Sequence, residues 1–432
     1  MDQNLQCIVA AETMHTQNNV PEITLNAGQQ RLFDMLTKVD RFNPIFVSGS
    51  AGTGKTALLM KLKNFWISQR KIVYVTAFTN MAARNINGKT CHSVFAFDFD
   101  LNLIVKKTFG VPHYLIIDEI SMIPEKMLDG IDSRLRQSSQ DSQLPFGGVN
   151  VIVFGDLYQL PPVNKNNAQP VFTADLWNLF YLYELKENMR QSEIIYIDNL
   201  NLLRLGKKEC LPYFNSLAVK NSPSKEETLN CTSLVSTNAE ADVINNNCYN
   251  IMRCAENELE LTCTYNIVNW NKKLAVYNQD QEAAIFKPFI KLCPGTRIII
   301  THNTQGLCNG DTGIIINVTE KVLYIRREFD NALYYLQPIK LYFNTNPFTK
   351  VKTVKGFPVK YAWAITIHKA QGLTVKNLIV YPECLFEAGQ AYVALSRCVH
   401  SDGLKLGGTV PENAIKSMSA ITDVYNNMPK LI

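Results

Sequence analysis

Residues 47–59 read VSGSAGTGKTALL, a glycine-rich segment between two aliphatic runs. From Gly49 to Thr56 the segment fits the pattern G-x-x-x-x-G-K-[ST]. Glycines let backbone N–H groups curve around a triphosphate, and a helix that begins at such a loop presents its positive end to the phosphates. The pattern predicts a phosphate loop in which Lys55 reaches the outer phosphates and Thr56 offers a hydroxyl to Mg²⁺. A glycine-rich turn without a ligand is the other interpretation. The expected nucleotide contacts are Gly49, Ser50, Ala51, Gly52, Thr53, Gly54, Lys55 and Thr56.

The segment YLIIDE, residues 114–119, supplies the expected partner of this loop. An apolar run brings Asp118 and Glu119 to the end of a buried strand, where two carboxylates are costly without a cation. Asp118 would bind Mg²⁺, directly or through water, and Glu119 would polarise the water that attacks the γ-phosphate of ATP. Taken alone, the pair could also mark an exposed strand end. Together the two motifs predict an ATPase or a GTPase.

Apolar strand-like runs alternate with helix-like stretches through the first part of the chain. The runs are PIFVSG, KIVYVTAF, HYLIIDE and VNVIVFGD. This alternation is typical of an α/β fold in which helices cover both faces of a parallel sheet. The strand, turn and helix pattern returns in TSLVSTNAEADVINN, so we expect a second α/β lobe after residue 190. Between residues 307 and 360 short β-type runs indicate a small all-β insertion.

Composition excludes several classes of protein. The 432 residues are 46% hydrophobic and 19% charged, which suits two or three domains. No apolar run is long enough to span a bilayer and the N-terminus lacks a secretory pattern, so we expect an intracellular protein without a membrane partner. The eleven cysteines are scattered and never form C-x-x-C, which favours reduced thiols over disulfides or a zinc site. A net charge of +5 is compatible with a polyanionic partner but does not require one.

A third strand-end motif lies in FGDLYQLPPV, residues 154–163. Gly155 and Asp156 end another buried strand, and Gln159 follows three residues later, where its amide could contact the γ-phosphate. The two prolines after it stiffen the exit, so that the nucleotide state could move a neighbouring segment.

With these motifs in order, the chain resembles the superfamily 1B DNA helicases of the petite-integration-frequency (Pif) and RecD type over nearly its whole length. The further segments that carry the resemblance are LNAGQQ (25–30), TAFTNMAARNINGKTCHS (76–93), ELKENMRQ (184–191), LCNGDTGIII (307–316), AWAITIHKAQGLT (362–374) and GQAYVALSR (389–397). The resemblance implies two RecA-like phosphate-loop lobes with parallel sheets and an SH3-like β insertion in the second lobe. The expected parts are a flexible tail at 1–24, a first lobe at 25–183 with a short insertion at about 94–113, a second lobe at 184–306 and 361–432, and the SH3-like insertion at 307–360.

For the ATP site, the resemblance adds residues from both lobes. It places Gln29 in the adenine-reading segment, Arg190 at a phosphate-contacting arginine and Arg397 at the arginine finger. Gln371 and Gly372 fall in the motif that couples ATP to DNA, with Gly372 as an ATP contact. Because the two arginines lie outside the first lobe in sequence, they reach the γ-phosphate only if two lobes clamp one ATP, and hydrolysis would let the cleft open. Taken singly, either arginine could be a surface residue.

DNA is expected to cross the top of both lobes. Hydroxyl, imidazole and backbone N–H donors suit phosphate contacts that position a strand without reading its sequence. Phe78 and Phe95 could stack on bases, and for Phe78 a place in the core is an equal alternative. The expected DNA contacts are Thr79, Thr90, His92, Ser93, Thr366 and His368.

Two departures from the family pattern concern DNA rather than ATP. The segment between His92 and Asp118, where the family carries a wedge that splits the duplex, is short and has no obvious hairpin. Strand separation could therefore be weak or performed by another loop. Where relatives commonly read T-G-x-A-A, residues 79–83 read TNMAA, which loses a glycine where backbone could approach the strand.

The leading hypothesis is a DNA-stimulated, Mg²⁺-dependent ATPase that moves 5′ to 3′ on single-stranded DNA and unwinds forked or tailed duplexes, with the polarity taken only from the resemblance. The resemblance also suggests DNA replication, repair, recombination or telomere maintenance, a nuclear or viral-replication setting, and a monomeric motor.

An ATP-gated DNA-binding switch with little processive unwinding is the second hypothesis. A chaperone-like ATPase or GTPase is the third, but it has no reason to contain TIHKAQG and YVALSR. The expected catalytic residues are Lys55, Asp118, Glu119, Gln159, Arg190 and Arg397, with Thr56 and Asp118 at Mg²⁺.

Overall fold

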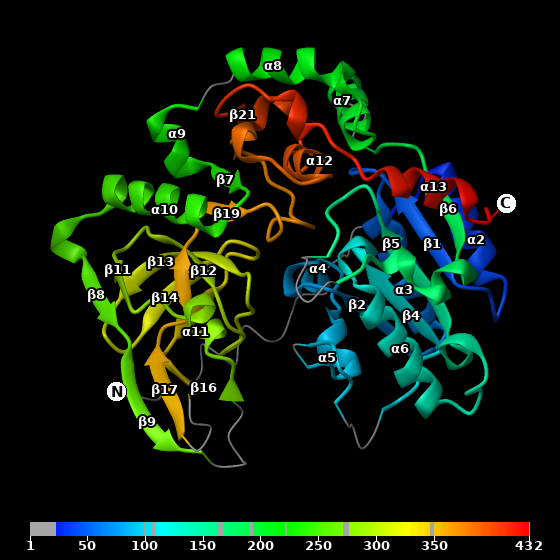
Figure 1. Ribbon diagram of the computed structural model, residues 1–432, viewed down its shortest axis with the longest axis horizontal. Coiled ribbons are helices and arrows are strands. Elements are labelled where there is room, and N and C mark those ends of the chain that lie inside the picture. The colour runs from blue at the N-terminus through cyan, green and yellow to red at the C-terminus, as the bar shows by residue number, and fades with distance from the viewer. Residues whose placement is uncertain are drawn as a thin grey trace, which may run out of the picture.

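The computed structural model describes residues 23–98, 100–104, 109–162, 168–189, 193–220, 223–270, 276–345 and 350–431. The tail predicted at 1–24 lies almost entirely outside this set. Figure 1 shows a first α/β lobe, a second α/β lobe and a region rich in antiparallel strands, which is inserted within the second lobe along the chain. Among the described residues, no helix has both the length and the apolar character that crossing a membrane requires.

The first lobe is built on a six-stranded sheet in the order β3-β2-β4-β5-β1-β6, and every strand pair in it is parallel. Its strands are β1 (Ile45–Gly49), β2 (Val73–Ala77), β3 (Lys89–Thr90), β4 (Tyr114–Asp118), β5 (Asn150–Gly155) and β6 (Tyr181–Leu185). Its helices are α2 (Ala27–Thr37), α3 (Lys55–Ser68), α4 (Asn80–Asn85), α5 (Cys91–Phe95) and α6 (Glu125–Ser138). All residues of β1, β4 and β5 are buried, which confirms the parallel sheet that the continuous apolar runs predicted.

Successive residues of the central strands face two separate cores. On β4, Leu115 and Ile117 join one apolar cluster, whereas Tyr114 and Ile116 join the other. This alternation follows from the two-residue period of a strand and places a helical layer on each face of the sheet. Because all six strands run parallel, their carboxyl ends lie at one edge of the sheet, where the three predicted strand-end motifs meet.

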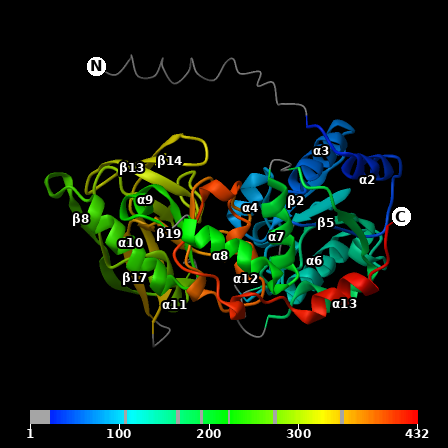
Figure 2. The same ribbon diagram turned by 90° about the horizontal axis from the view of Figure 1, so that it is seen from above.

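The second lobe contains a four-stranded parallel sheet in the order β19-β7-β20-β21. Its strands are β7 (Thr232–Val235), β19 (Ala364–Thr366), β20 (Leu378–Val380) and β21 (Leu404–Leu406). Its helices are α7 (Ile194–Arg204), α8 (Leu211–Lys220), α9 (Lys225–Asn230), α10 (Asn238–Met252) and α12 (Gln390–Leu395). Seen from above, α7 and α12 lie between the β-rich region and the first lobe (Figure 2).

The β-rich region runs from β8 to β18 and is longer than the insertion predicted at 307–360. It contains a five-stranded antiparallel sheet, β15-β14-β13-β12-β18, a four-stranded sheet, β10-β16-β17-β9, and the pair β11-β8. Its elements are β8 (Leu259–Thr262), β9 (Thr264–Asn269), β10 (Val276–Tyr277), α11 (Asp280–Ile285), β11 (Phe289–Leu292), β12 (Arg297–Ile300), β13 (Thr312–Val318), β14 (Leu323–Arg327), β15 (Leu333–Leu336), β16 (Ile339–Asn344), β17 (Lys350–Gly356) and β18 (Val359–Tyr361). The early strands escaped the sequence prediction because strands such as β9 are mostly exposed and carry no apolar run.

An ion pair links the β-rich region to the first lobe. Arg84, at the end of α4, pairs with Asp311, whose side chain is almost completely buried. The Arg84 guanidinium also lies 5.7 Å from the ring centroid of Phe329. Helix α4 begins beside Thr79, so this contact holds a predicted DNA-contacting segment against the β-rich region.

The last helix, α13 (Ser419–Asn427), packs on the first lobe, although the sequence placed residues 361–432 in the second. Ile421 and Tyr425 belong to the same apolar cluster as Phe46 of β1. The Tyr425 hydroxyl lies 2.6 Å from the Ser48 hydroxyl, and red α13 lies beside the blue strand β1 in Figure 1. The chain thus returns from the second lobe to the back of the phosphate-loop strand.

Replacement of Ile421 by alanine tests this packing. The Ile421 side chain is 1% exposed, so the truncation leaves a cavity, and we expect the free energy of unfolding to fall by about 2–4 kcal/mol. The measurement is urea denaturation followed by circular dichroism. Asp423→Ala on the exposed face of the same helix is the control and should change the midpoint little. Equal effects of the two variants would contradict the packing of α13 on the first lobe.

Candidate functional site

The segment predicted to bind phosphate forms a tight loop between β1 and α3. Gly54 has φ +73° and stands at the N-terminus of α3. This backbone conformation favours glycine, and a Cβ atom at this position, 2.3 Å from Nε2 of Gln29, would displace the Gln29 amide. Inside the loop, the Thr53 hydroxyl donates to the Ser50 carbonyl at 2.9 Å. The loop therefore has the curvature that the spacing of the glycines predicted.

Lys55 occupies the inside of this loop. Its Nζ donates to the Gly49 carbonyl at 2.6 Å and to the Ser50 carbonyl at 3.1 Å. Burial lowers the pKa of Lys55, while the nearby acids, Asp156 foremost, raise it. Two neutral carbonyls are weak partners for a buried ammonium, and a phosphate oxygen would be a stronger one.

The acidic pair lies at the carboxyl end of β4, as predicted. Burial, and then the charge of Glu119, raise the pKa of Asp118 from 3.8 to about 7. Glu119 has φ +51°. Within the described part of the chain, Glu119 Oε2 is one of six buried side-chain atoms without a hydrogen-bond partner. A cation or an ordered water beside the pair would stabilise the Asp118 carboxylate and give Glu119 Oε2 a partner.

These residues fit a magnesium ion that is shared with phosphate oxygens. The Asp118 carboxylate and the Thr56 hydroxyl are the hard oxygen donors that Mg²⁺ prefers. In the described ranges, His, Cys, Asp and Glu do not gather in groups of three or more that could hold a metal ion. In nucleotide enzymes the protein usually supplies few Mg²⁺ ligands and the substrate supplies others.

Two glutamines from different lobes meet beside the acidic pair. Gln371 Nε2 donates to the Ser121 hydroxyl at 3.0 Å and to Gln159 Oε1 at 3.4 Å, and all three residues are buried. Gly372 lies next to Glu119, because a Cβ atom on Gly372 would be 3.6 Å from Glu119 Oε1. The structure thus brings the coupling motif of the second lobe to the strand ends of the first.

The two predicted arginines are placed differently. Arg190 lies outside the described residues, but the segment before it contacts the phosphate loop: Asn188 Nδ2 donates to the Ala51 carbonyl and the Met189 N–H donates to the Gly52 carbonyl, each at 3.0 Å. The buried guanidinium of Arg397 bonds within its own lobe. Its donors reach the Val393 carbonyl at 2.9 Å, the Ser396 hydroxyl at 3.0 Å and the Leu373 carbonyl at 3.2 Å. Contact of Arg397 with a γ-phosphate stays a prediction.

Gln29 supports the phosphate loop in this structure. Its Nε2 donates to the Thr53 carbonyl at 2.9 Å and to the Gly54 carbonyl at 3.2 Å, and its Oε1 accepts from the Asn26 N–H at 2.9 Å. Because both ends of this fully buried amide are engaged, the predicted adenine contact would require these bonds to be exchanged.

On the first lobe, two of the predicted DNA contacts act as helix caps. The Thr79 hydroxyl accepts from the Ala82 N–H at 3.2 Å and begins α4. The Thr90 hydroxyl accepts from the backbone N–H of Ser93, an exposed residue, at 3.3 Å and begins α5. Phe95 is fully buried in the core, so the proposal that it stacks on bases is wrong.

His92 and the second-lobe residues complete the predicted DNA set. The His92 ring lies 5.4 Å from the Phe78 ring, and burial lowers the pKa of His92. Thr366 ends β19 and is buried, and His368 Nε2 lies 3.4 Å from Glu387 Oε2. Their contacts with DNA stay predictions.

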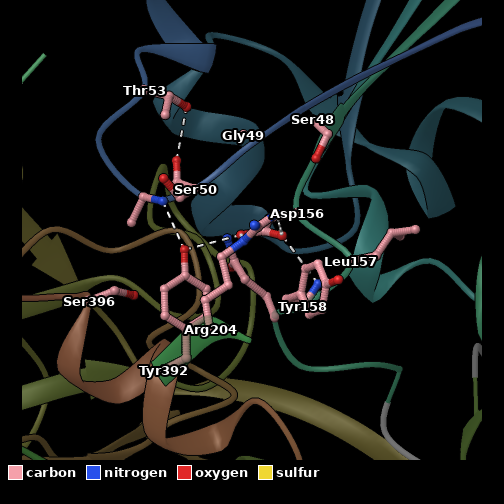
Figure 3. A network of polar contacts seen from close by, with 12 residues as sticks. Ser48, Gly49, Ser50, Thr53, Asp156, Leu157, Tyr158, Arg204, Tyr392 and Ser396 are labelled. Carbon is pink, nitrogen blue, oxygen red and sulfur yellow. Dashed lines mark hydrogen bonds and ion pairs between the residues drawn. The ribbon is translucent and has the colours of Figure 1, made fainter. Parts of the chain in front are cut away.

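The sequence missed a network that joins the two lobes at the phosphate loop (Figure 3). Asp156 is completely buried, and the Arg204 guanidinium, from α7, donates to both of its carboxylate oxygens at 2.8 Å. The Tyr392 hydroxyl, from α12, donates to Asp156 Oδ2 at 3.1 Å and accepts from the Ala51 N–H at 2.9 Å. The signal in the sequence was the acid at the end of a buried strand, which requires a cation, but nothing local names that cation.

Comparison with known proteins agrees with this geometry. A model of the PIF1-like helicase family matches residues 24–201. The ATP-dependent DNA helicase Pif1 of Campylobacter jejuni is 26% identical over 422 residues, which cover 88% of this chain and 92% of that protein. The chain is thus similar in sequence to PIF1-like helicases, with the family model matching its first lobe. The Xenopus laevis ATP-dependent DNA helicase PIF1 is 28% identical over 89% of this Pif1-like chain, but only 62% of that protein is covered.

Solved structures match the Pif1-like chain over both lobes. The crystal structure of Bacteroides Pif1 bound to single-stranded DNA has a TM-score of 0.76 and 28% identity, covering 93% of this chain and 96% of that one. The complex of Bacteroides Pif1 with ADP-AlF3 and single-stranded DNA also has a TM-score of 0.76 and 28% identity, and it covers 93% of this chain and 97% of that chain. The fold prediction of two RecA-like lobes is thereby confirmed, whereas the SH3-like character of the insertion stays a prediction.

Replacement of Asp118 by asparagine tests the charge crowding at the acidic pair. The pKa of Asp118 is higher in the folded protein, about 7, than its ordinary 3.8, so its contribution to stability is present at low pH and is lost as the pH rises toward 7. The nucleotide-free variant should therefore gain stability relative to the native protein, by about 1–3 kcal/mol between pH 5 and pH 8.

The measurement is the free energy of unfolding in urea at a series of pH values without Mg²⁺. Asp423→Asn, on the exposed face of α13, should keep the native pH dependence. A constant difference between Asp118→Asn and the native protein across this range would contradict the raised pKa.

Proposed function

We propose that this Pif1-like helicase hydrolyses ATP with Mg²⁺ and uses the energy to move 5′ to 3′ along single-stranded DNA and to separate forked or tailed duplexes. The observation that carries the proposal is the meeting of both lobes at the phosphate loop. Lys55, Asp118 and Gln159 come from the first lobe, while Gln371 and Tyr392 reach the same place from the second. A ligand bound there contacts two bodies at once, so its hydrolysis changes their separation.

Each residue at the site has a definite task in such a cycle. Lys55 would exchange the Gly49 and Ser50 carbonyls for phosphate oxygens, which are stronger acceptors. Asp118 and Thr56 would hold Mg²⁺, which neutralises charge on the phosphate oxygens when it is bound. Glu119, with one carboxylate oxygen unpartnered, would orient the attacking water. Gln159 and Gln371 would report the presence of the γ-phosphate to the coupling motif.

The proposal that DNA is the substrate is supported by the relatives and by the positions of the predicted contacts. One matching structure is Bacteroides Pif1 bound to single-stranded DNA. Another is described as the structural basis for DNA unwinding at forked double-stranded DNA by two coordinating Pif1 helicases. The 5′-to-3′ polarity, the monomeric motor and the setting at sites of genome replication rest on the family resemblance. Nonspecific phosphate contacts from hydroxyl groups and backbone N–H groups would let the strand slide.

The ATP-gated switch stays as the alternative because of the short wedge segment. In the described part of residues 94–113, Phe97 and Leu103 form an isolated antiparallel bridge. Hydrogen bonds from the Asp98 N–H to the Asn102 carbonyl and from the Ile104 N–H to the Ala96 carbonyl flank it, and none of these described residues belongs to a strand. A protein of this kind would hydrolyse ATP on DNA without efficient unwinding.

Lys55→Ala tests the ATP site. Single-stranded DNA should raise the ATP turnover of the native protein, and the variant should lose at least about a hundredfold of this turnover because the phosphate oxygens lose their cation. DNA binding, measured by fluorescence anisotropy, should remain. Lys61→Ala, on the same helix with its Nζ bonded to the Ile23 carbonyl, is the control and should hydrolyse ATP normally. If single-stranded DNA does not raise the ATP turnover of the native protein, the motor hypothesis is contradicted.

Directionality is tested with duplexes that differ only in their single-stranded tail. We expect ATP-dependent separation of a 5′-tailed duplex and no separation of the matching 3′-tailed duplex, measured by the release of a labelled strand. A preference for the 3′ tail would contradict the proposed polarity. DNA-stimulated hydrolysis without separation of either duplex would favour the switch.

A further inference from the structure

The helix that leads to Arg397 is hydrogen-bonded to the opposite lobe through the hydroxyl group of Tyr392. Tyr392, in the middle of α12, is 1% exposed, and its hydroxyl donates to Asp156 Oδ2 and accepts from the Ala51 N–H. Figure 3 shows this hydroxyl between the Ser50 end of the phosphate loop and the carboxylate of Asp156. Both partners belong to the first lobe, so the phenol is a direct link between α12 and the phosphate loop.

The acceptor of this bond is itself held rigidly. Arg204 forms a bidentate pair with Asp156, and its guanidinium carbon lies 4.4 Å from the ring centroid of Tyr158. A forked arginine pair fixes the plane of a carboxylate, whereas a point charge would let it rotate. The Asp156 carboxylate therefore presents Oδ2 to Tyr392 in one orientation.

The C-terminal end of α12 holds the Arg397 guanidinium by hydrogen bonds. The helix ends at Leu395, and the Arg397 guanidinium donates to Val393 and Ser396 in its last turn. Arg397 follows Tyr392 by five positions and the end of α12 by two. Any displacement of α12 relative to the phosphate loop is thus passed to the guanidinium.

Helix α12 also starts in close contact with the first lobe. Gly389, which precedes it, has φ +79°, and a Cβ atom at Gly389 would lie 2.7 Å from the Tyr158 carbonyl. The helix is therefore pressed against the segment that follows Asp156 at its start and bonded to the loop at Tyr392. These two contacts leave little freedom for the spacing between the lobes at this point.

We propose that Tyr392, held by Asp156 and Arg204, is a positioning residue that sets the distance between Arg397 and the phosphate loop and so governs the rate of ATP hydrolysis rather than the affinity for ATP. This inference rests on the ATP hydrolysis proposed above. A nucleotide that moves Ala51 also moves the bond partner of Tyr392, so the link carries the state of the loop to α12 and its arginine.

Tyr392→Phe is the direct test because it removes one hydroxyl and keeps the buried ring. The expected result is a fall in kcat for DNA-stimulated ATP hydrolysis of about tenfold, the ratio that one hydrogen bond lost in the transition state produces. The KM for ATP and the Kd of a fluorescent ADP analogue should change by less than about threefold. Arg204→Lys, which keeps the cation but loses the fork, should lower kcat in the same direction.

Tyr196→Phe is the matched control. The Tyr196 hydroxyl is also buried and also bonds to α12, donating to the Leu395 carbonyl at 2.6 Å, but from α7 within the same lobe. Its loss should lower thermal stability and leave kcat close to the native value. An equal fall of kcat in both variants would show that general loosening of α12, and not the link between lobes, is responsible.

A double-mutant cycle with Arg397→Ala tests whether Tyr392 acts through the arginine. If it does, the Tyr392→Phe, Arg397→Ala protein hydrolyses ATP as slowly as Arg397→Ala alone in single-turnover measurements. Multiplied effects of the two changes, a raised KM with native kcat, or a native kcat in Tyr392→Phe would each overturn the inference. A native protein that does not hydrolyse ATP would instead overturn the proposed function on which the inference rests.

Discussion

The pairing of one buried carboxylate with a cation from another lobe is the constraint on which this structure depends. Asp156 ends a central strand with no exposure to solvent, and an uncompensated charge there would cost several kcal/mol. The charge that compensates it, Arg204, comes from the first helix of the second lobe. Folding of the first lobe to its full stability therefore requires the second lobe to dock at the phosphate loop, which is also where a nucleotide would bind.

The remaining charges at the loop are arranged for a ligand rather than for stability. Lys55 bonds only to carbonyls of its own loop in the contacts described above, and Asp118 and Glu119 crowd each other at the end of β4. Burial works against the charge of Lys55, whereas burial and like-charge repulsion together work against the acidic pair. Phosphate oxygens and a divalent cation would relieve these costs together, and in the proposed cycle their release would change the spacing of the lobes.

Local sequence patterns predicted those parts of the site whose geometry is local. The phosphate loop follows from backbone conformations at Gly52 and Gly54, and the acidic pair follows from the apolar run of β4. Side-chain roles follow less directly from local patterns, because one side chain has several possible uses. Thr79 and Thr90 cap helices, Gln29 braces the loop, and Phe95 fills the core, although each sits in the segment where a ligand contact was expected.

The amino-acid sequence by itself determined the two parallel sheets, the phosphate loop and the order of the motifs, because strand burial and turn geometry depend on neighbours along the chain. Only the tertiary structure decided that α13 returns to the first lobe, that antiparallel strands begin at β8, and that Asp156 meets Arg204 and Tyr392. These partners are 48 and 236 residues away from Asp156. No periodicity specifies such a pairing, since it arises only when the packed helices of one lobe present their charges to the strand ends of the other.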